Sequence, residues 1–209
     1  KPVTEPELDE VALPVAQAGQ GGATPAGPPP WSELRSEPLG ALLRDMNKTS
    51  NNLIARHLLL SLAPDFPQRP ATLAAAQARV RAWLDGHGLD AQGLALDSGS
   101  GLSRADRGSA RALVALLRGA ALGPMAQELF ASLPVAGVDG TLEHRLRGGA
   151  AQGQAWLKTG TLLDARSLAG YVRNRRGQLI AVALICNDAQ AAQATPALDA
   201  CIEWLARRA

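Results

Sequence analysis

The feature that most limits the fold of this chain is a set of three short runs in its last third, each typical of a β-strand. The runs cover residues 154–159, 167–173 and 179–186, and Asn174–Gly177 joins the last two as a tight hairpin. A helical pattern follows at about 197–208. Helices followed by an antiparallel meander and a last helix predict an α+β fold, with a helical cluster packed on an antiparallel sheet.

The stretch before the meander has the spacing of helices. Residues 53–62 are apolar on nearly every side, so this helix is expected to be buried. A polar cluster at 47–52 precedes it and resembles a helix end followed by an N-cap. Asp106 is expected to cap a later helix. The helices expected before the sheet are 39–46, 53–62, 71–85, 106–117 and 125–133.

Composition argues against several classes of protein. The net charge of +2 is too small to suggest binding to nucleic acid or to an anionic membrane surface. No apolar run reaches the ~18 residues of a membrane-spanning helix, so no transmembrane segment is expected. The histidines and cysteines share no metal-binding spacing, and neither a metal nor another cofactor is expected. Cys186 and Cys201 lie in apolar runs and are expected to be buried free thiols, with a disulfide as the alternative in an oxidising compartment.

One lysine stands out because this chain otherwise uses arginine as its cation. Lysine occurs at only three of 21 basic positions, namely Lys1, Lys48 and Lys158. Lys158 lies in the strand-like stretch Trp156–Thr161, directly before a Thr-Gly pair. Its compact ammonium differs from the fork of a guanidinium, which indicates a need for a point charge at this strand edge. A surface lysine at a strand end is the simpler alternative.

A second short motif, Ser50-Asn51-Asn52, lies between two predicted helices. Ser-x-Asn and Lys-Thr-Gly, together with Ser-x-x-Lys, are the signature of penicillin-binding proteins and class A β-lactamases, both active-site serine enzymes. Each triplet alone is a weak signal, and Ser50 as a helix N-cap is the alternative. The two triplets in this order, one between helices and one on a strand, indicate a site for acyl transfer.

The chain resembles the low-molecular-mass class C penicillin-binding proteins, which are serine-type D-alanyl-D-alanine carboxypeptidases and endopeptidases. The resemblance covers roughly residues 32–209, and its longer Gly-rich and Leu-Pro stretches distinguish this family from the β-lactamases. It implies a fold of the serine β-lactamase/transpeptidase type. The matching segments are Ser50–Leu53, Gly99–Arg104, Leu133–Thr141, Lys158–Thr161 and Leu168–Tyr171.

The chain departs from the family in one motif, because it contains no Ser-x-x-Lys. Asp45 and Ala155 stand three residues before the two internal lysines, where the serine would be. The first residue is also not Met, so we expect this chain to be the C-terminal part of a longer protein. The resemblance implies that residues 1–31 are a linker and the end of an inserted domain, and that 32–209 are the C-terminal part of the catalytic domain. The missing N-terminal segment would then be a partner of this chain, which is expected to be inactive alone.

The resemblance also implies catalytic roles for three side chains. Lys158 would bind the carboxylate of a peptide ending in D-Ala-D-Ala. Ser50 would pass a proton to the leaving amine, and Asn52 would hold the substrate's amide with its donor and its acceptor. The nucleophile of the Ser-x-x-Lys motif would come from the missing segment.

The rest of the strand motif is expected to bind substrate. Thr159 and Thr161 would offer hydroxyls to the same carboxylate. Gly160 would let a peptide lie close against the strand and add to its edge. By resemblance, the backbone N–H of Thr161 is half of the oxyanion hole, and the absent serine supplies the other half.

Four other polar residues in the matching segments are expected to be structural. Ser100 and Ser103 lie in a Gly-Ser-rich stretch and are predicted to form turns. Arg104 and Asp139 are predicted to brace loops as ion-pair partners.

The expected activity is that of a peptidoglycan D-Ala-D-Ala carboxypeptidase/endopeptidase in the periplasm or another extracytoplasmic compartment. Its expected partners are peptidoglycan stem peptides ending in D-Ala-D-Ala, and β-lactam antibiotics. A relative that binds wall peptides without catalysis is an alternative. A β-lactamase-like hydrolase is another, but it needs a general-base carboxylate that the sequence does not identify.

Overall fold

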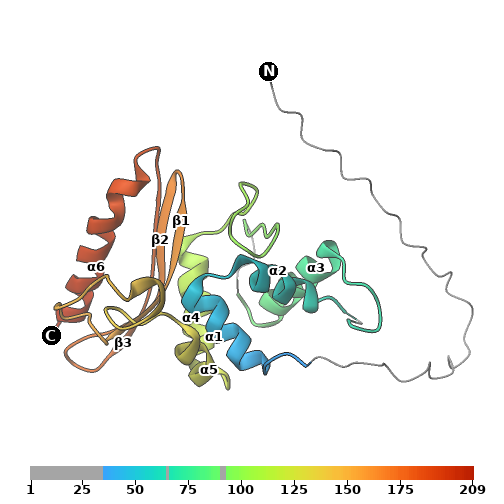
Figure 1. Ribbon diagram of the computed structural model, residues 1–209, viewed down its shortest axis with the longest axis horizontal. Helices are drawn as coiled ribbons and strands as arrows, with labels where there is room; N and C mark the ends of the chain where they lie inside the picture. Colours follow the sequence, from blue (N-terminus) through green and yellow to red (C-terminus); the bar gives the residue numbers. More distant parts are fainter. Residues whose placement is uncertain (1–34, 65, 90–92) are drawn as a thin grey trace, which may run out of the picture. The chain divides into compact units, whose positions relative to one another are not determined.

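The structure is a computed structural model that describes residues 35–64, 66–89 and 93–209, and Glu37–Ala209 form one compact unit. The predicted α+β fold is confirmed (Figure 1). The expectation for residues 1–31 concerns a stretch outside the described residues. The helices are α1 (Leu39–Thr49), α2 (Asn52–Ser61), α3 (Leu73–Gly86), α4 (Ala110–Leu122), α5 (Ala126–Ser132) and α6 (Thr195–Arg207), with short 3-10 turns η1 (Gly140–Leu142) and η2 (Ala191–Ala194).

The three predicted strands form one antiparallel sheet in the order β1-β2-β3. The strands are β1 (Ala155–Leu162), β2 (Ala165–Arg173) and β3 (Leu179–Asn187), so β1 begins one residue later and ends three residues later than predicted, β2 begins two residues earlier, and β3 ends one residue later. The hairpin at 174–177 joins β2 to β3 as predicted, and Asn174 Oδ1 accepts bonds from the N–H groups of Arg176 and Gln178.

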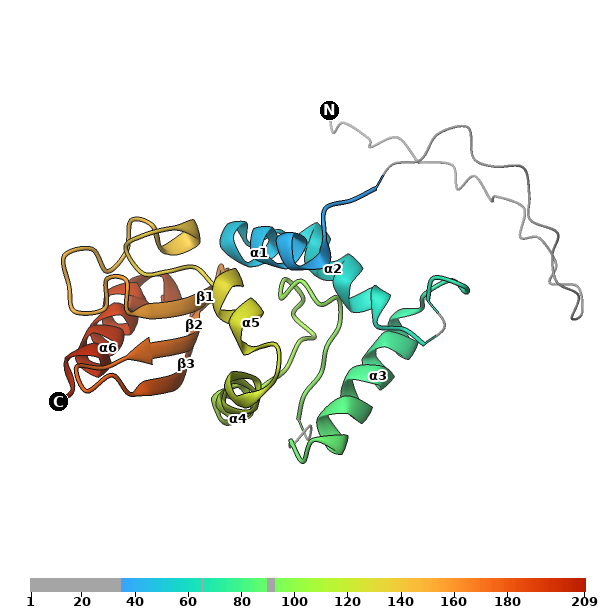
Figure 2. The ribbon, with the colours of Figure 1, turned by 90° about the horizontal axis from the view of Figure 1, so that it is seen from below.

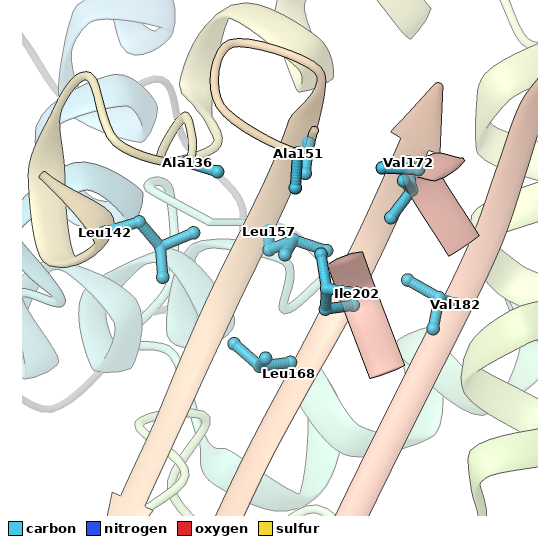
Figure 3. Close-up of a cluster of buried hydrophobic side chains, with 10 residues drawn as sticks. Ala136, Leu142, Ala151, Leu157, Leu168, Val172, Val182 and Ile202 are labelled. Carbon is cyan, nitrogen blue, oxygen red and sulfur yellow. The ribbon is translucent and has the colours of Figure 1, made fainter. Parts of the chain in front are cut away.

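The main core lies between the sheet and α6. Figure 3 shows side chains of all three strands meeting Ile202 of α6. Gly170 of β2 pairs with Leu157 on one side and with Val182 on the other, which places these two side chains on the same face. The buried residues of this cluster are Ala136, Leu142, Ala151, Ala155, Leu157, Leu168, Val172, Val182, Ile202 and Ala206.

The alternation along β1 decides where Lys158 points. Ala155 and Leu157 are fully buried in the core beside α6. Since successive side chains of a strand leave from opposite faces, Trp156 and Lys158 point to the other face, toward the helical cluster. Trp156 meets Phe130 of α5 edge-on, with ring centroids 5.8 Å apart. Burial of Leu157 therefore fixes the direction of Lys158.

Helices α4 and α5 lie on the face of the sheet opposite α6 (Figures 1 and 2). Tyr171 of β2 anchors them, because its hydroxyl donates to the carbonyl of Leu117 in α4 at 2.6 Å. Its ring also packs on Phe130, with centroids 4.5 Å apart. Burial raises the pKa of Tyr171, so the hydroxyl keeps its proton for this bond.

Two expectations for the helices are wrong. Helix α2 is not buried: Leu59 is its one buried residue, and the side chain of Leu53 is 64% exposed. The reason is that, among the described helices and strands, α2 packs mainly against α1 and α3 and has no extensive contact with the sheet that would cover the rest of its surface. Asp106 does not cap α4, since the hydroxyl of Ser109 accepts the N–H of Ala112 and the helix begins there.

The expected burial of the two cysteines is also wrong. Both are free thiols, but Cys186 on β3 is only partly buried and Cys201 on α6 is exposed. On α6 it is the next residue, Ile202, that turns toward the core and is fully buried. An apolar run in the sequence therefore did not identify which of its members face inward.

The helical cluster leaves large apolar side chains on the surface. Leu122 at the end of α4 is 91% exposed, and Met125 and Leu53 are each 64% exposed. Exposed apolar surface of this kind favours association. We expect the 209-residue chain, expressed alone, to form oligomers or aggregates in sedimentation velocity. A monodisperse, highly stable monomer would contradict this expectation.

Candidate active site

Ser50 follows α1 in an uncommon backbone conformation. Its φ of 59° places it in the left-handed region, where non-glycine residues are rare, and its N–H donates to the carbonyl of Met46. The cap of the next helix is Asn51, whose Oδ1 accepts the N–H of Ile54 at 3.1 Å. The hydroxyl of Ser50 is therefore not used for capping, which removes the simpler interpretation of this serine.

Lys158 and Ser50 meet across a gap of 108 residues in the sequence. The ammonium of Lys158 donates to Ser50 Oγ and, at 2.9 Å, to the carbonyl oxygen of Thr159. The side chain is partly buried between the sheet and the α1–α2 loop, and this burial lowers the pKa of Lys158 from its ordinary value. The structure thus brings a partly desolvated ammonium against a hydroxyl that is held by a fixed backbone turn.

All six residues predicted for the site line one open cleft of about 720 Å³. One wall comes from the end of α1, the 50–52 loop and the start of α2, and the opposite wall comes from residues 158–161 of β1. The 99–102 loop and two residues after Asp139 complete the lining. The predicted residues found together are Ser50, Asn52, Lys158, Thr159, Gly160 and Thr161.

Each of the three substrate-binding candidates has a distinct setting. The hydroxyl of Thr159 bonds to that of Thr141 at 3.0 Å, whereas Thr161 is exposed. A Cβ at Gly160 would overlap the hydroxyl oxygen of Ser167 on β2. A side chain at position 160 would therefore require the hydroxyl of Ser167 to rotate away.

Sequence reasoning did not assign Thr141 and Arg145 to the site. Thr141 belongs to a matching segment, whereas no sequence motif includes Arg145. The Arg145 guanidinium binds the Asp199 carboxylate of α6, with Nη2–Oδ1 at 2.5 Å and Nε–Oδ2 at 3.3 Å. The useful signal for Thr141 was its place directly after Asp139-Gly140, a turn that carries the chain to the edge of the cleft.

The serines of the 99–103 stretch bond within their own turn, as predicted. Ser100 Oγ lies 2.8 Å from Ser98 Oγ, and Ser103 Oγ accepts the N–H of Ala105 at 3.0 Å. Arg104 forms an exposed ion pair with Asp164 in the β1–β2 turn, and it lowers the pKa of that carboxyl. Arg104 therefore braces a loop, which agrees with the expectation.

The described lining of the cleft contains hydroxyl, amide, ammonium and guanidinium groups. No Asp or Glu is among the described residues that line it, and no group of three or more acidic, His or Cys side chains in the described parts of the chain could hold a metal. Such a set of groups can bind a carboxylate, orient an amide and pass a proton through a hydroxyl. A three-stranded antiparallel sheet between α6 and a helical cluster, with these motifs at its first strand, defines a protein of the serine β-lactamase/transpeptidase-like class.

Comparison with known proteins identifies the family within this class. Residues 15–208 match the D-Ala-D-Ala carboxypeptidase 3 (S13) family. The chain belongs to this family, and the expected likeness to low-molecular-mass class C penicillin-binding proteins is confirmed.

Two relatives show how much of a whole family member this chain represents. It is 41% identical over 149 residues to the D-alanyl-D-alanine carboxypeptidase of Actinomadura sp. (strain R39), covering 69% of this chain and 28% of the relative. It is 33% identical to D-alanyl-D-alanine carboxypeptidase DacB of Haemophilus influenzae, covering 73% of this chain and 32% of the relative. The chain therefore spans about a third of the length of these curated relatives.

Solved structures agree with the fold. Penicillin-binding protein 4 of Haemophilus influenzae, in complex with a β-lactam, superposes with a TM-score of 0.75 at 28% identity, over 83% of this chain and 42% of that protein. A predatory endopeptidase of Bdellovibrio bacteriovorus superposes with a TM-score of 0.66 over 81% of this chain and 45% of the endopeptidase. Its identity is only 21%, so this second likeness bears on the fold alone.

Proposed function

We propose that this chain forms one wall of the active site of a serine D-alanyl-D-alanine carboxypeptidase/endopeptidase that acts on peptidoglycan stem peptides. The observation that carries the proposal is the contact between Lys158 and Ser50 inside the cleft, between two motifs that are far apart in sequence. Membership of the S13 family and the names of the relatives support the same chemistry.

The open edge of β1 suits an extended peptide. One edge of this strand pairs with β2 along its whole length. On the other edge, its first residues bond to the 134–136 segment, with Leu157 N–H donating to Pro134 O and Ala136 N–H donating to Ala155 O, both at 2.9 Å. Beyond Leu157, the described residues place no strand against this edge. A substrate peptide can therefore add to β1 beside Lys158 by backbone hydrogen bonds.

Each motif residue then has a defined task. The ammonium of Lys158 binds the terminal carboxylate of D-Ala-D-Ala, with Thr159 and Thr161 as further hydroxyl donors. Asn52 holds the substrate amide with both ends of its side chain. The proposal assigns the nucleophilic serine to a Ser-x-x-Lys segment outside this chain, since this sequence has none.

The proposed acylation replaces an amide bond of the substrate by an ester bond to the serine, and it uses no cofactor. The serine oxygen forms an ester with the carbonyl carbon of the penultimate D-Ala, and the C–N bond to the terminal D-Ala breaks. The serine proton leaves through a neighbouring base, and the departing amine gains a proton through the hydroxyl of Ser50. The N–H of Thr161 is proposed to stabilise the developing oxyanion.

The decisive experiment is to express the chain together with the residues encoded before Lys1 and to expose the product to a fluorescent penicillin. We expect covalent labelling that prior incubation with unlabelled penicillin blocks. We also expect release of D-Ala from a stem peptide ending in D-Ala-D-Ala. A product that contains an upstream Ser-x-x-Lys and yet takes up no label would contradict the proposal.

Two other functions are distinguished by the same experiment. A relative that only binds wall peptides would lack the upstream Ser-x-x-Lys and would retain stem peptides without releasing D-Ala. A β-lactamase-like hydrolase would turn penicillin over quickly, which requires a carboxylate to activate water. The absence of Asp and Glu from the described lining of the cleft favours a long-lived acyl-enzyme instead.

The proposed substrate implies a location. Peptidoglycan stem peptides lie outside the cytoplasmic membrane, so the proposed enzyme acts in the periplasm or another extracytoplasmic compartment. In the described parts of the chain, no helix is both long and apolar enough to cross a membrane.

A further inference from the structure

The two lysines in the described residues both lie close to Ser50, although lysine is rare in this chain. Only three of its 21 basic residues are lysine. Lys158 contacts the hydroxyl of Ser50 from the sheet. Lys48 lies two residues before Ser50, in the last turn of α1, and it does not line the cleft. The function proposed above gives Lys48 no task.

Lys48 binds three acceptors at once. Its ammonium donates to the carbonyl oxygen of Leu133 at 2.6 Å, and to Oδ1 and Oδ2 of Asp139 at 2.8 Å and 2.6 Å. An ammonium has three N–H donors on a single atom, so every donor is used. A guanidinium spreads its donors over a flat fork and could not direct three of them from one atom. The Lys48 side chain is only 17% exposed and that of Asp139 is 41% exposed, so the ion pair is partly shielded from solvent.

The same stretch of chain also holds strand β1. Residues 133–140, here called the connecting segment, bond to β1 through Leu157 N–H to Pro134 O and through Ala136 N–H to Ala155 O, both at 2.9 Å. Asp139 Oδ1 accepts the N–H of Val135 as well as the ammonium of Lys48. One end of the connecting segment is thus fixed to the strand of Lys158, and its carboxylate is fixed to the helix turn before Ser50.

Two further contacts fasten α1 to this region. Asn47 Nδ2 donates to Ser132 Oγ at 2.8 Å, and Ser132 is buried at the end of α5. Gly140 lies so close to the end of α1 that a Cβ there would be 2.8 Å from the carbonyl oxygen of Lys48. The last turn of α1 therefore packs directly on the connecting segment, and the ion pair between Lys48 and Asp139 joins the two.

We propose that Lys48 is a positioning residue: through Asp139 and the connecting segment, it fixes the distance between Ser50 and the strand that carries Lys158. This inference rests on the proposed function, because the hydroxyl that Lys48 places is the proposed proton relay. Ser50 is in a left-handed conformation, which costs free energy, so the turn needs such an external support to persist.

The test compares variants of the full protein, expressed with the residues encoded before Lys1. Lys48→Met should slow acylation by a fluorescent penicillin by roughly 10- to 100-fold, the effect of a small displacement of a catalytic group. Lys48→Met combined with Asp139→Asn removes both charges and leaves no unpaired carboxylate, and it should show a similar loss. This double variant also serves if the single variant fails to fold.

A cycle with Ser50→Ala separates positioning from general destabilisation. If Lys48 acts through Ser50, then adding Lys48→Met to a Ser50→Ala background should change acylation by about twofold or less, the range in which unrelated effects vary. Equal losses in both backgrounds would overturn the positioning role. Glu203→Gln is the matched control, because Glu203 of α6 binds the N–H groups of Ala150 and Ala151 away from the cleft.

Acylation of the Glu203→Gln control and of the wild-type protein decides the remaining outcomes. Glu203→Gln should lower the thermal midpoint without slowing acylation more than about twofold. A Lys48 variant that slows acylation no more than Glu203→Gln does would also overturn the inference. A wild-type protein that takes up no penicillin would overturn the proposed function and the positioning role together, whereas a labelled wild type with an equally fast Lys48→Met variant would overturn the positioning role alone.

Discussion

Replacing Lys158 by methionine should slow acylation by a fluorescent penicillin roughly 10²- to 10³-fold, while the protein remains folded. Methionine fills similar space but removes the charge that is proposed to hold the carboxylate of the substrate or of the antibiotic. The loss is expected to be large because the ammonium is partly buried, and burial strengthens its attraction to an anion. Labelling rates and circular dichroism of the full protein are the measurements.

A matched control for Lys158→Met is Arg173→Met. Arg173 lies at the end of β2 with its guanidinium 5.2 Å from the ring centre of Trp156, so it is another cation on the same sheet that does not line the cleft. Its replacement should leave acylation within about twofold of the wild type. Equal losses from Lys158→Met and Arg173→Met would mean that the net charge of the sheet, and not the position of Lys158, matters for acylation.

Lys158→Arg adds a pH signature to this prediction. Burial lowers the pKa of Lys158 below 10.5, and only the protonated amine can attract a carboxylate. The wild-type rate should therefore fall as pH rises through this lowered pKa. A guanidinium stays charged to about pH 12, so Lys158→Arg should be slower than the wild type but should keep its rate over the same pH range. An alkaline fall shared by both proteins would assign the titration to another group.

The strands could be predicted because their evidence is local. Each strand is a short run of β-forming residues, and Asn174–Gly177 supplies a tight turn at the required place. The burial of α2 could not be predicted in this way, because an apolar helix is buried only where other elements cover it. Helix α2 packs mainly against α1 and α3 among the described helices and strands, and Leu53 remains exposed. The cap of α4 was misplaced because Asp106 and Ser109 are equally suitable residue types.

The candidate site likewise contains residues that the sequence could predict and contacts that it could not. Short motifs were enough to select Ser50 and Lys158, whose hydrogen-bond contact then emerged from the fold. The contact behind the proposed role of Lys48 could not be predicted, because its partner Asp139 lies 91 residues away in the sequence. Asp139 was expected to brace a loop through an ion pair, which is confirmed, but only the structure identifies the helix that it binds. Contacts between residues so distant in sequence have no local pattern that would reveal them.

Gly170→Ala should give the largest loss of stability of any single methyl group added to the sheet, about 3 kcal/mol. Gly170 has a φ of 151° and lies in the middle strand, opposite Leu157. This backbone conformation is nearly restricted to glycine and costs other residues about 1–3 kcal/mol. A Cβ there would also overlap the carbonyl oxygen of Trp156 and lie 3.0 Å from Leu157 Cα, so β1 must move away.

Gly177→Ala separates these two causes. Gly177 in the β2–β3 hairpin has a φ of 76°, and a Cβ there would meet no atom within 4 Å. The loss of stability of Gly177→Ala should therefore reflect the cost of the backbone conformation alone, about 1–2 kcal/mol. The midpoint temperature of thermal unfolding of the full protein should fall for both variants, and the fall for Gly177→Ala should be about one to two thirds of that for Gly170→Ala. Gly170→Ala should in addition slow acylation, because the shifted strand carries Lys158, whereas equal effects of the two substitutions on stability would mean that β1 accommodates the added methyl group without moving.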